Sequence, residues 1–201
     1  HGVDNQKFYP SKKKYDHNDE TFHLLTIRRL ESRMGLSELI HAIQIIKDNY
    51  KVNIKLTIGG QGNEYINLKK LIKKLKCDKQ VELVGYIPEN AIRNIISSAD
   101  LFILPSRKLE GFGLVMLESM ACGTPVLVSP YGGQKEIIEK FDKTLILKNI
   151  KPHTIAIKIL DIIKSNKINS NFKKDTLCFV NENFSWKKHA SDYEEIFSKY
   201  V

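Results

Sequence analysis

The sequence predicts an α/β fold in which a doubly wound, Rossmann-like, mainly parallel six-stranded sheet is followed by C-terminal helices. Short apolar runs alternate with amphipathic stretches of helical periodicity from residue 23 onward. Such alternation is typical of parallel sheets with right-handed crossovers. Turns rich in glycine and arginine follow several of the apolar runs. Because ligands of these sheets bind outside the carboxyl ends of the strands, we expect these turns to meet at one edge.

The individual elements follow from the spacing of the apolar residues. Six segments have the length and composition of buried parallel strands; they are residues 23–27, 54–58, 81–84, 101–104, 125–128 and 144–147. Between them, apolar residues recur at intervals of three and four, which indicates amphipathic helices. These helices are expected at residues 35–49, 64–75, 89–97, 113–122 and 135–140.

The two ends of the chain differ from this pattern. Helical stretches follow the last strand segment at residues 151–165, 171–181 and 185–200. Ser185 is expected to be the N-cap of the last one, since its hydroxyl can accept a first-turn amide, and Trp186 is expected to be buried there. The first residues are polar and lack periodicity. We therefore predict a linker at 1–22, an α/β domain at 23–183 and a C-terminal helix at 184–201.

Composition and charge exclude several classes of protein. The chain has 201 residues, 42% of them hydrophobic, and a formal net charge of +9. Most lysines alternate with apolar residues at helical spacing, which indicates solvated helix faces rather than a base-stacking surface. We expect no nucleic-acid partner. No apolar run reaches the length of a bilayer span and no signal peptide is evident. The few, widely spaced cysteines, three in number, favour a reducing, cytoplasmic compartment.

Cysteine and histidine usage bears on metal binding. The three cysteines are few and widely spaced, and the six histidines show no metal-ligand spacing. A disulfide framework or a zinc site is therefore not expected.

The most informative segment is 110–133, EGFGLVMLESMACGTPVLVSPYGG. Glu110 precedes the turn Gly111-Phe112-Gly113, and Glu118 lies about two helical turns further on. Glycine lets the backbone approach a ligand closely, and the N-terminus of the following helix is a favourable seat for a phosphate. Carboxylates accept hydrogen bonds from vicinal hydroxyls. These features together suit a ligand with phosphates in the middle and sugars on both sides.

Together with Gly123-Thr124-Pro125, the following Val126-Leu127-Val128 and Gly132-Gly133, this segment resembles the donor site of the retaining glycosyltransferases of family 4. That site carries two glutamates separated by seven residues. The start of the chain, with Gly2-Val3-Asp4 and then Lys7-Phe8-Tyr9-Pro10, is similar to the domain junction of such two-domain GT-B enzymes. The resemblance implies that the chain is the C-terminal, donor-binding half. It also implies that this half alone is inactive, because the acceptor-holding half is missing.

The resemblance implies roles for the residues of this segment. Glu110 would bind hydroxyls of the donor hexose, and Glu118 would bind the ribose hydroxyls. The turn between them would hold the hexose and the β-phosphate through Gly111, Phe112, Gly113 and Leu114. Departure of the nucleoside diphosphate leaves an oxocarbenium-like centre, and preorganised cations stabilise the growing phosphate charge. Glu110 and Arg29 are therefore the candidate catalytic residues.

The remaining donor contacts are expected in the turns after the first three strands. By the resemblance, Arg29 and a base five residues later contact the diphosphate, and guanidinium groups bind phosphate bidentately. Met34 stands where a lysine is usual, so Arg33 is expected to replace it. Gly60 lies in a loop near the donor. The loop with Gly85 and Tyr86 would meet the nucleobase through its backbone, which leaves uracil and guanine both open.

The implied activity is transfer of a hexose from a UDP- or GDP-sugar to a glycan or lipid-linked acceptor, as in polysaccharide biosynthesis. No cofactor and no metal are expected, because the sequence has no Asp-x-Asp motif. A lipid-linked acceptor and a basic surface would bring the protein to the inner face of the membrane. The alternatives are a nucleotide-sugar 2-epimerase of the same architecture and a non-catalytic nucleotide-binding module. A dinucleotide-binding module predicts G-x-G-x-x-G after the first strand, where this chain has Arg28-Arg29-Leu30-Glu31.

Overall fold

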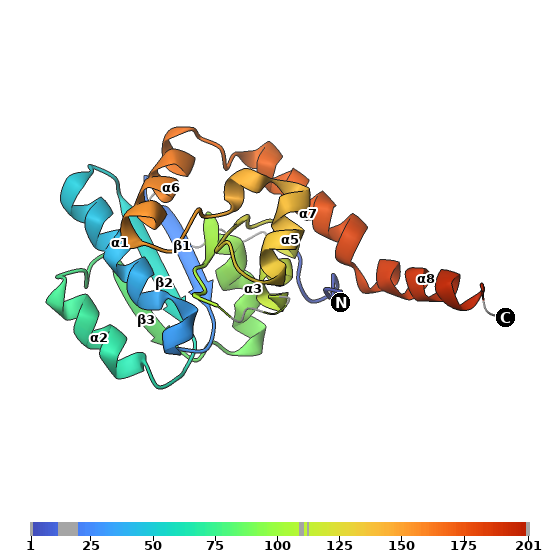
Figure 1. Cartoon of the computed structure of the whole chain (residues 1–201), viewed down its shortest axis with the longest axis horizontal. Helices are drawn as coiled ribbons and strands as arrows, with labels where there is room; N and C mark the ends of the chain where they lie inside the picture. Colours follow the sequence, from blue (N-terminus) through green and yellow to red (C-terminus); the bar gives the residue numbers. More distant parts are fainter. Residues whose placement is uncertain (1, 12–19, 109–110, 112, 200–201) are drawn as a thin grey trace.

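The computed structural model describes residues 2–11, 20–108, 111 and 113–199. In this part of the chain the sheet has five strands in the order β3-β2-β1-β4-β5, and its four strand pairs are parallel (Figure 1). The strands are β1 (Phe22–Ile27), β2 (Ile54–Gly59), β3 (Val81–Gly85), β4 (Leu101–Leu104) and β5 (Val126–Val128). The winding reverses between β1 and β4, which is where such sheets form a ligand crevice.

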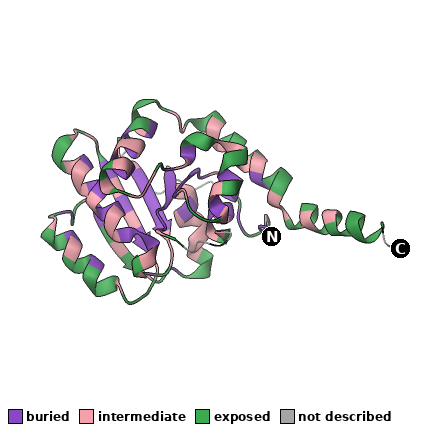
Figure 2. Ribbon diagram, viewed as in Figure 1, coloured by how far each residue is buried: buried purple, intermediate pink, exposed green. Residues whose placement is uncertain are grey.

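Burial explains why these segments are strands. The strands β1, β4 and β5 are mostly apolar and are buried along almost their whole length, as expected for a sheet covered on both faces (Figure 2). Phe102 of β4 is the largest of the fully enclosed side chains. The predicted α/β fold class is confirmed, with one strand fewer than expected.

Helices cover both faces of this sheet. They are α1 (Leu36–Asn49), α2 (Tyr65–Lys74), α3 (Glu89–Ser98), α4 (Leu114–Ala121), α5 (Gly133–Phe141), α6 (Pro152–Lys164), α7 (Ser170–Phe184) and α8 (Trp186–Phe197). Two short 3₁₀ turns are η1 (Ser32–Met34) and η2 (Lys143–Leu145). Helix α1 packs against α2 and α6, and α4 packs against α3 and α7 (Figure 1). Within the described ranges, no helix combines the length and apolar character needed to cross a bilayer.

The predicted sixth strand, residues 144–147, is wrong. A carboxylate oxygen of Asp142 accepts hydrogen bonds from the amide of Thr144 at 2.9 Å and from its hydroxyl at 2.7 Å. This cap holds the segment in η2, because a local side-chain hydrogen bond of this kind favours a turn over pairing with a neighbouring strand. The end of the segment still reaches the sheet, where the Leu147 amide donates to the Val128 carbonyl at 2.8 Å.

Residues 2–11 pack on the body of the domain. A turn forms in which the Phe8 amide donates to the Asp4 carbonyl at 2.8 Å, and it buries Val3 and Phe8. The Val3 amide donates to the carbonyl of Phe184 at the end of α7, at 2.7 Å. Val3 and Phe8 of this segment thus contribute to the core. The role of residues 1–22 as a linker between domains stays a prediction.

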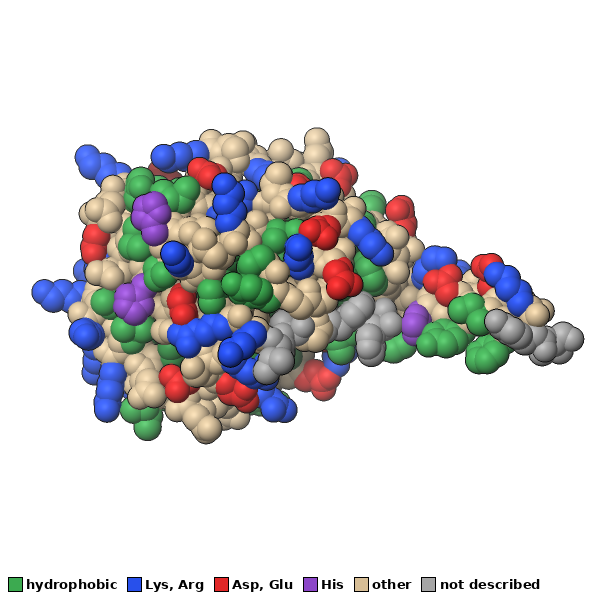
Figure 3. Space-filling view, in the orientation of Figure 1, with side chains coloured by type: hydrophobic (Ala, Val, Ile, Leu, Met, Phe, Trp, Pro, Cys, Tyr) green, Lys and Arg blue, Asp and Glu red, His purple; other side chains and the backbone are tan. Residues whose placement is uncertain are grey.

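Helix α8 begins as predicted but packs differently. The amide of Lys188 donates to the Ser185 hydroxyl at 3.2 Å, which confirms the N-cap. Trp186 is 54% exposed, so its predicted burial is wrong. All of α8 is described and none of its residues is buried, because the helix runs away from the sheet (Figures 1 and 2). The rings of Trp186, His189, Tyr193 and Phe197 contact one another in succession along this helix. Hydrophobic side chains gather along one side of the projecting helix in Figure 3.

Candidate functional site

Backbone hydrogen bonds join the turns that follow β1, β2 and β3. The Arg28 amide donates to the Gly59 carbonyl at 3.0 Å, and the Gly60 amide donates to the Gly85 carbonyl at 2.6 Å. Gly60 has φ +125°, and a Cβ there would lie 1.8 Å from the Arg28 carbonyl oxygen. A glycine is required for this approach of the two turns. The parallel topology therefore brings the predicted Arg29 and Gly60 turns side by side.

These two turns border a cavity of about 460 Å³. Arg28, Arg29 and Glu31 line it on one side, and residues 60–63 line it on the other. Arg29 is exposed, so its guanidinium is accessible to a ligand arriving from solvent. A planar cation beside a bare glycine backbone is suited to bind phosphate oxygens.

Arg33 is held against the loop that follows β4. Gly35 ends η1 with φ +70°, and a Cβ there would lie 1.8 Å from the Pro105 carbonyl oxygen. The Arg107 amide donates to the Arg33 carbonyl at 2.8 Å. The Arg33 Nε pairs with the Glu31 carboxylate at 2.9 Å. A phosphate at Arg33 would therefore compete with a neighbouring carboxylate, which distinguishes Arg33 from Arg29.

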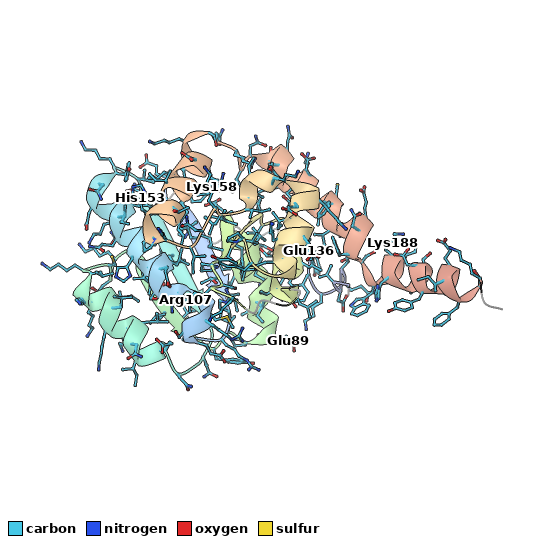
Figure 4. The ribbon with its side chains drawn as sticks, viewed as in Figure 1. Glu89, Arg107, Glu136, His153, Lys158 and Lys188 are labelled. Carbon is cyan, nitrogen blue, oxygen red and sulfur yellow. The ribbon has the colours of Figure 1, made fainter. Side chains whose placement is uncertain are left out.

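Arg107 fixes the same loop to the start of α1, and the sequence analysis missed it. Its guanidinium pairs with Glu38 at 2.6 Å and donates to the hydroxyls of Ser32 and Ser37. Figure 4 shows Arg107 near the same lower edge as Glu89, away from His153 and Lys158 on α6. This network gives the β1 and β4 turns one rigid frame. An arginine three residues after the end of the apolar strand β4 was the available signal.

The N-terminus of α4 points to the same region. Its N-cap, Gly113, is left-handed with φ 70° and ψ 53°, and the first turn contains no acidic residue. First-turn amides of a helix have no partner within the helix and attract anions. The Gly133 amide donates to the Gly111 carbonyl at 3.1 Å, which joins this turn to the start of α5. Leu114 is 48% exposed.

The predicted Glu110 and Phe112 lie outside the described residues. The roles given to them rest on the sequence, and they stay predictions.

Glu118 lies half-buried in α4, and its charged neighbours come from elsewhere in the chain. Burial raises the pKa of its carboxyl group; Lys7 opposes this rise and Glu89 adds to it. Lys7 and Glu89 form an ion pair with each other. The sequence analysis missed both residues, because only the turn that buries Phe8 brings Lys7 to this place.

Gly85 and Tyr86 also lie at the carboxyl edge of the sheet. Gly85 ends β3 with φ +70°, and Tyr86 is 67% exposed. An exposed aromatic ring here is available to a planar ligand group. The predicted nucleobase contact remains untested.

Comparison with known proteins decides the family. The family model "Glycosyl transferases group 1" matches residues 8–176 of this chain. The chain belongs to the group 1 glycosyl transferases. An uncharacterized glycosyltransferase of Methanocaldococcus jannaschii is 31% identical to this chain over 183 residues. The match covers 89% of this chain and 45% of the relative. The chain thus spans about half the length of the curated relatives it matches.

Solved structures of other glycosyltransferases have the same fold as this chain. The C-terminal domain of a group 1 family glycosyl transferase from Francisella tularensis is similar with a TM-score of 0.78 and 24% identity, covering 92% of this chain and all of that one. Anabaena HepE, solved with UDP-glucose, is similar with a TM-score of 0.80 and 19% identity, covering 98% of this chain and 56% of that one. The Rossmann-like fold is that of the C-terminal domains of GT-B glycosyltransferases.

Proposed function

We propose that this domain binds the nucleoside-diphosphate sugar used by a retaining hexosyltransferase of family 4. The observation that carries the proposal is the placement of three anion-binding features at the carboxyl edge of the sheet. Arg29 and Arg33 follow β1, the α4 N-terminus follows β4, and the winding reverses between these two strands. The spacing of Glu110 and Glu118 supports family 4. The fold similarity to a protein solved with UDP-glucose supports a nucleotide-sugar donor.

The proposed chemistry is departure of the nucleoside diphosphate from the anomeric carbon. Arg29 binds the diphosphate and stabilises the negative charge that grows on it as the bond breaks. Arg33 and the first-turn amides of α4 assist, and a low-dielectric site makes such fixed cations and dipoles effective. Glu110 orients the hexose through its hydroxyls, and Glu118 orients the ribose.

These groups also make a metal ion unnecessary for charge neutralisation. A diphosphate needs cations close to its oxygens, and two guanidinium groups with a helix N-terminus supply them. We therefore propose that donor binding is independent of divalent metal.

The acceptor, a glycan or a lipid-linked glycan, is assigned to a part of the enzyme outside this chain. The relatives are about twice as long as the chain, and transfer requires the acceptor to be held against the donor. Accordingly, we assign donor binding, and not the complete reaction, to the domain.

Calorimetric titration of the domain tests the proposal. UDP or GDP, and the corresponding nucleotide sugar, should bind with a stoichiometry of one. NAD and a single-stranded oligonucleotide serve as controls for a dinucleotide-binding module and for a basic nucleic-acid binder. Binding of either control in preference to the nucleoside diphosphates would refute the proposed function.

A further inference from the structure

One buried polar group near the candidate site lacks a partner. Gln134, in the first turn of α5, is fully enclosed. Its side-chain Nε2 donates to the Ser129 hydroxyl at 2.7 Å, which fixes the amide. Its Oε1 is also buried, and no described residue donates to it. Buried acceptors without a donor are uncommon in native proteins, and each one calls for an explanation.

The surroundings of Gln134 suggest what the oxygen is for. A Cβ at Gly113 would lie 3.7 Å from the Cβ of Gln134, so the glutamine lies directly against that glycine. The Gly133 amide donates to the Gly111 carbonyl at 3.1 Å, so the turn before α4 and the turn before α5 support each other. Gly113 and Gly132 both have positive φ, and glycine changes its backbone conformation at little cost.

We propose that Gln134 is a positioning residue of the donor site. When the β-phosphate of the donor binds at the α4 N-terminus, an amide of Gly111 or Gly113 turns toward Gln134 and donates to its Oε1. This hydrogen bond satisfies the oxygen and holds the first-turn amides of α4 toward the phosphate. Gln134 acts through the turn and does not touch the ligand. The inference rests on the proposed function, which it deepens.

The expected consequence is a gain in binding affinity that is confined to ligands with a β-phosphate. Satisfying a buried acceptor is worth roughly a factor of five to a hundred in an equilibrium constant. The gain requires a β-phosphate, so it should appear with UDP and UDP-glucose and be missing with UMP.

Two variants and one control test this inference. Gln134→Met removes the amide at nearly constant size, and the double variant Ser129→Ala/Gln134→Met also removes its partner. Thr124→Val is the control, because the Thr124 hydroxyl is buried and donates to the Ile96 carbonyl at 2.8 Å, in a contact between the loop before β5 and α3. Each protein is titrated calorimetrically with UMP, UDP and UDP-glucose, and its thermal unfolding is measured.

The expected result separates binding from stability. Removing both members of a buried polar pair is close to neutral, so the double variant should unfold at or above the wild-type temperature. It should bind UDP and UDP-glucose about fivefold or more weakly and UMP unchanged. Hydrogen exchange at the Gly111 and Gly113 amides should slow on UDP binding in the wild type and less in the variant. Thr124→Val should lower the unfolding temperature and leave the ratio of UDP to UMP affinity unchanged.

Three other results overturn the inference in distinguishable ways. Wild-type protein that binds no nucleotide refutes the proposed function and the inference with it. If the wild type binds nucleotide but the Gln134 variants keep the same ratio of UDP to UMP affinity, Gln134 has only a structural role. Equal losses for UMP and UDP, together with a lower unfolding temperature, show a general loosening of the domain.

Discussion

Gly60→Ala is expected to damage both the stability of the domain and its phosphate site. A Cβ at this position would lie 1.8 Å from the Arg28 carbonyl oxygen. Side chains essentially never approach backbone so closely, so the turn that carries Arg28 and Arg29 must move. Gly85→Ala is the matched control. Gly85 also has positive φ, at +70°, but a Cβ there would meet no atom within 4 Å.

The magnitude follows from the difference between the two sites. Both alanines adopt a strained backbone, at a cost of about 1–3 kcal/mol. The clash at Gly60 additionally breaks the bonds that join the turns, from Arg28 to Gly59 at 3.0 Å and from Gly60 to Gly85 at 2.6 Å. At about 1 kcal/mol for each bond, Gly60→Ala should cost roughly 2 kcal/mol more free energy of unfolding than Gly85→Ala.

Urea denaturation of both variants measures this difference, and calorimetry with UDP measures the phosphate site. Gly60→Ala should have the lower denaturation midpoint and the weaker UDP binding, because Arg29 is displaced with the turn. Equal midpoints for the two variants would show that the contact between the β1 and β2 turns does not hold the site together.

The remaining predictions concern the carboxylates, the metal and turnover. Glu118→Gln should weaken the binding of UDP and of UDP-sugar alike, by about tenfold, because charged hydrogen bonds to the ribose become neutral. Burial raises the pKa of Glu118, so the folded chain holds this proton to a higher pH than the unfolded chain. The contribution of Glu118 to stability is therefore largest below its unfolded pKa and falls as the pH rises through its folded pKa. At neutral pH, Glu118→Gln should raise the free energy of unfolding. A lower free energy of unfolding than that of the wild type would contradict this. Glu110→Gln should leave the affinity for UDP unchanged and reduce the extra affinity given by the sugar. Equal losses of UDP affinity in the Glu110 and Glu118 variants would contradict the assignment of the hexose to Glu110 and the ribose to Glu118. UDP binding should survive EDTA, and a loss restored by Mg²⁺ or Mn²⁺ would disprove the metal-free site. The domain alone should transfer no hexose, so robust transfer would show that it holds the acceptor itself.

The sequence predicts the elements of this fold well where burial alone decides them. β4 begins and ends as predicted, because four consecutive apolar residues between turn signals leave little alternative. Residues 144–147 also read as a strand, but the Asp142 cap decides their conformation, and a side-chain cap is not visible in hydrophobic periodicity. Trp186 reads as a core residue, yet α8 leaves the body of the domain.

The candidate site was predictable as far as it depends on topology. Parallel strands put Arg29, Gly60 and Gly85 at one edge, and glycine spacing marked the turns. Lys7 and Gln134 could not be found this way. Tertiary packing of a segment that reads as a linker brings Lys7 near enough to Glu118 to oppose the rise in its pKa, and a glutamine is ordinarily an exposed residue.

Removal of the Arg29 charge tests the central claim, that this edge of the sheet binds a diphosphate, most directly. Lys79→Gln is the matched control, because it lowers the net charge equally at the opposite edge, just before β3, where Lys79 lines a separate hollow. Surface charges farther apart than about 8 Å are largely screened at physiological salt. We expect UDP to bind Arg29→Gln about tenfold or more weakly and Lys79→Gln as tightly as the wild type. Equal affinities for the two variants would contradict the assignment of the donor site.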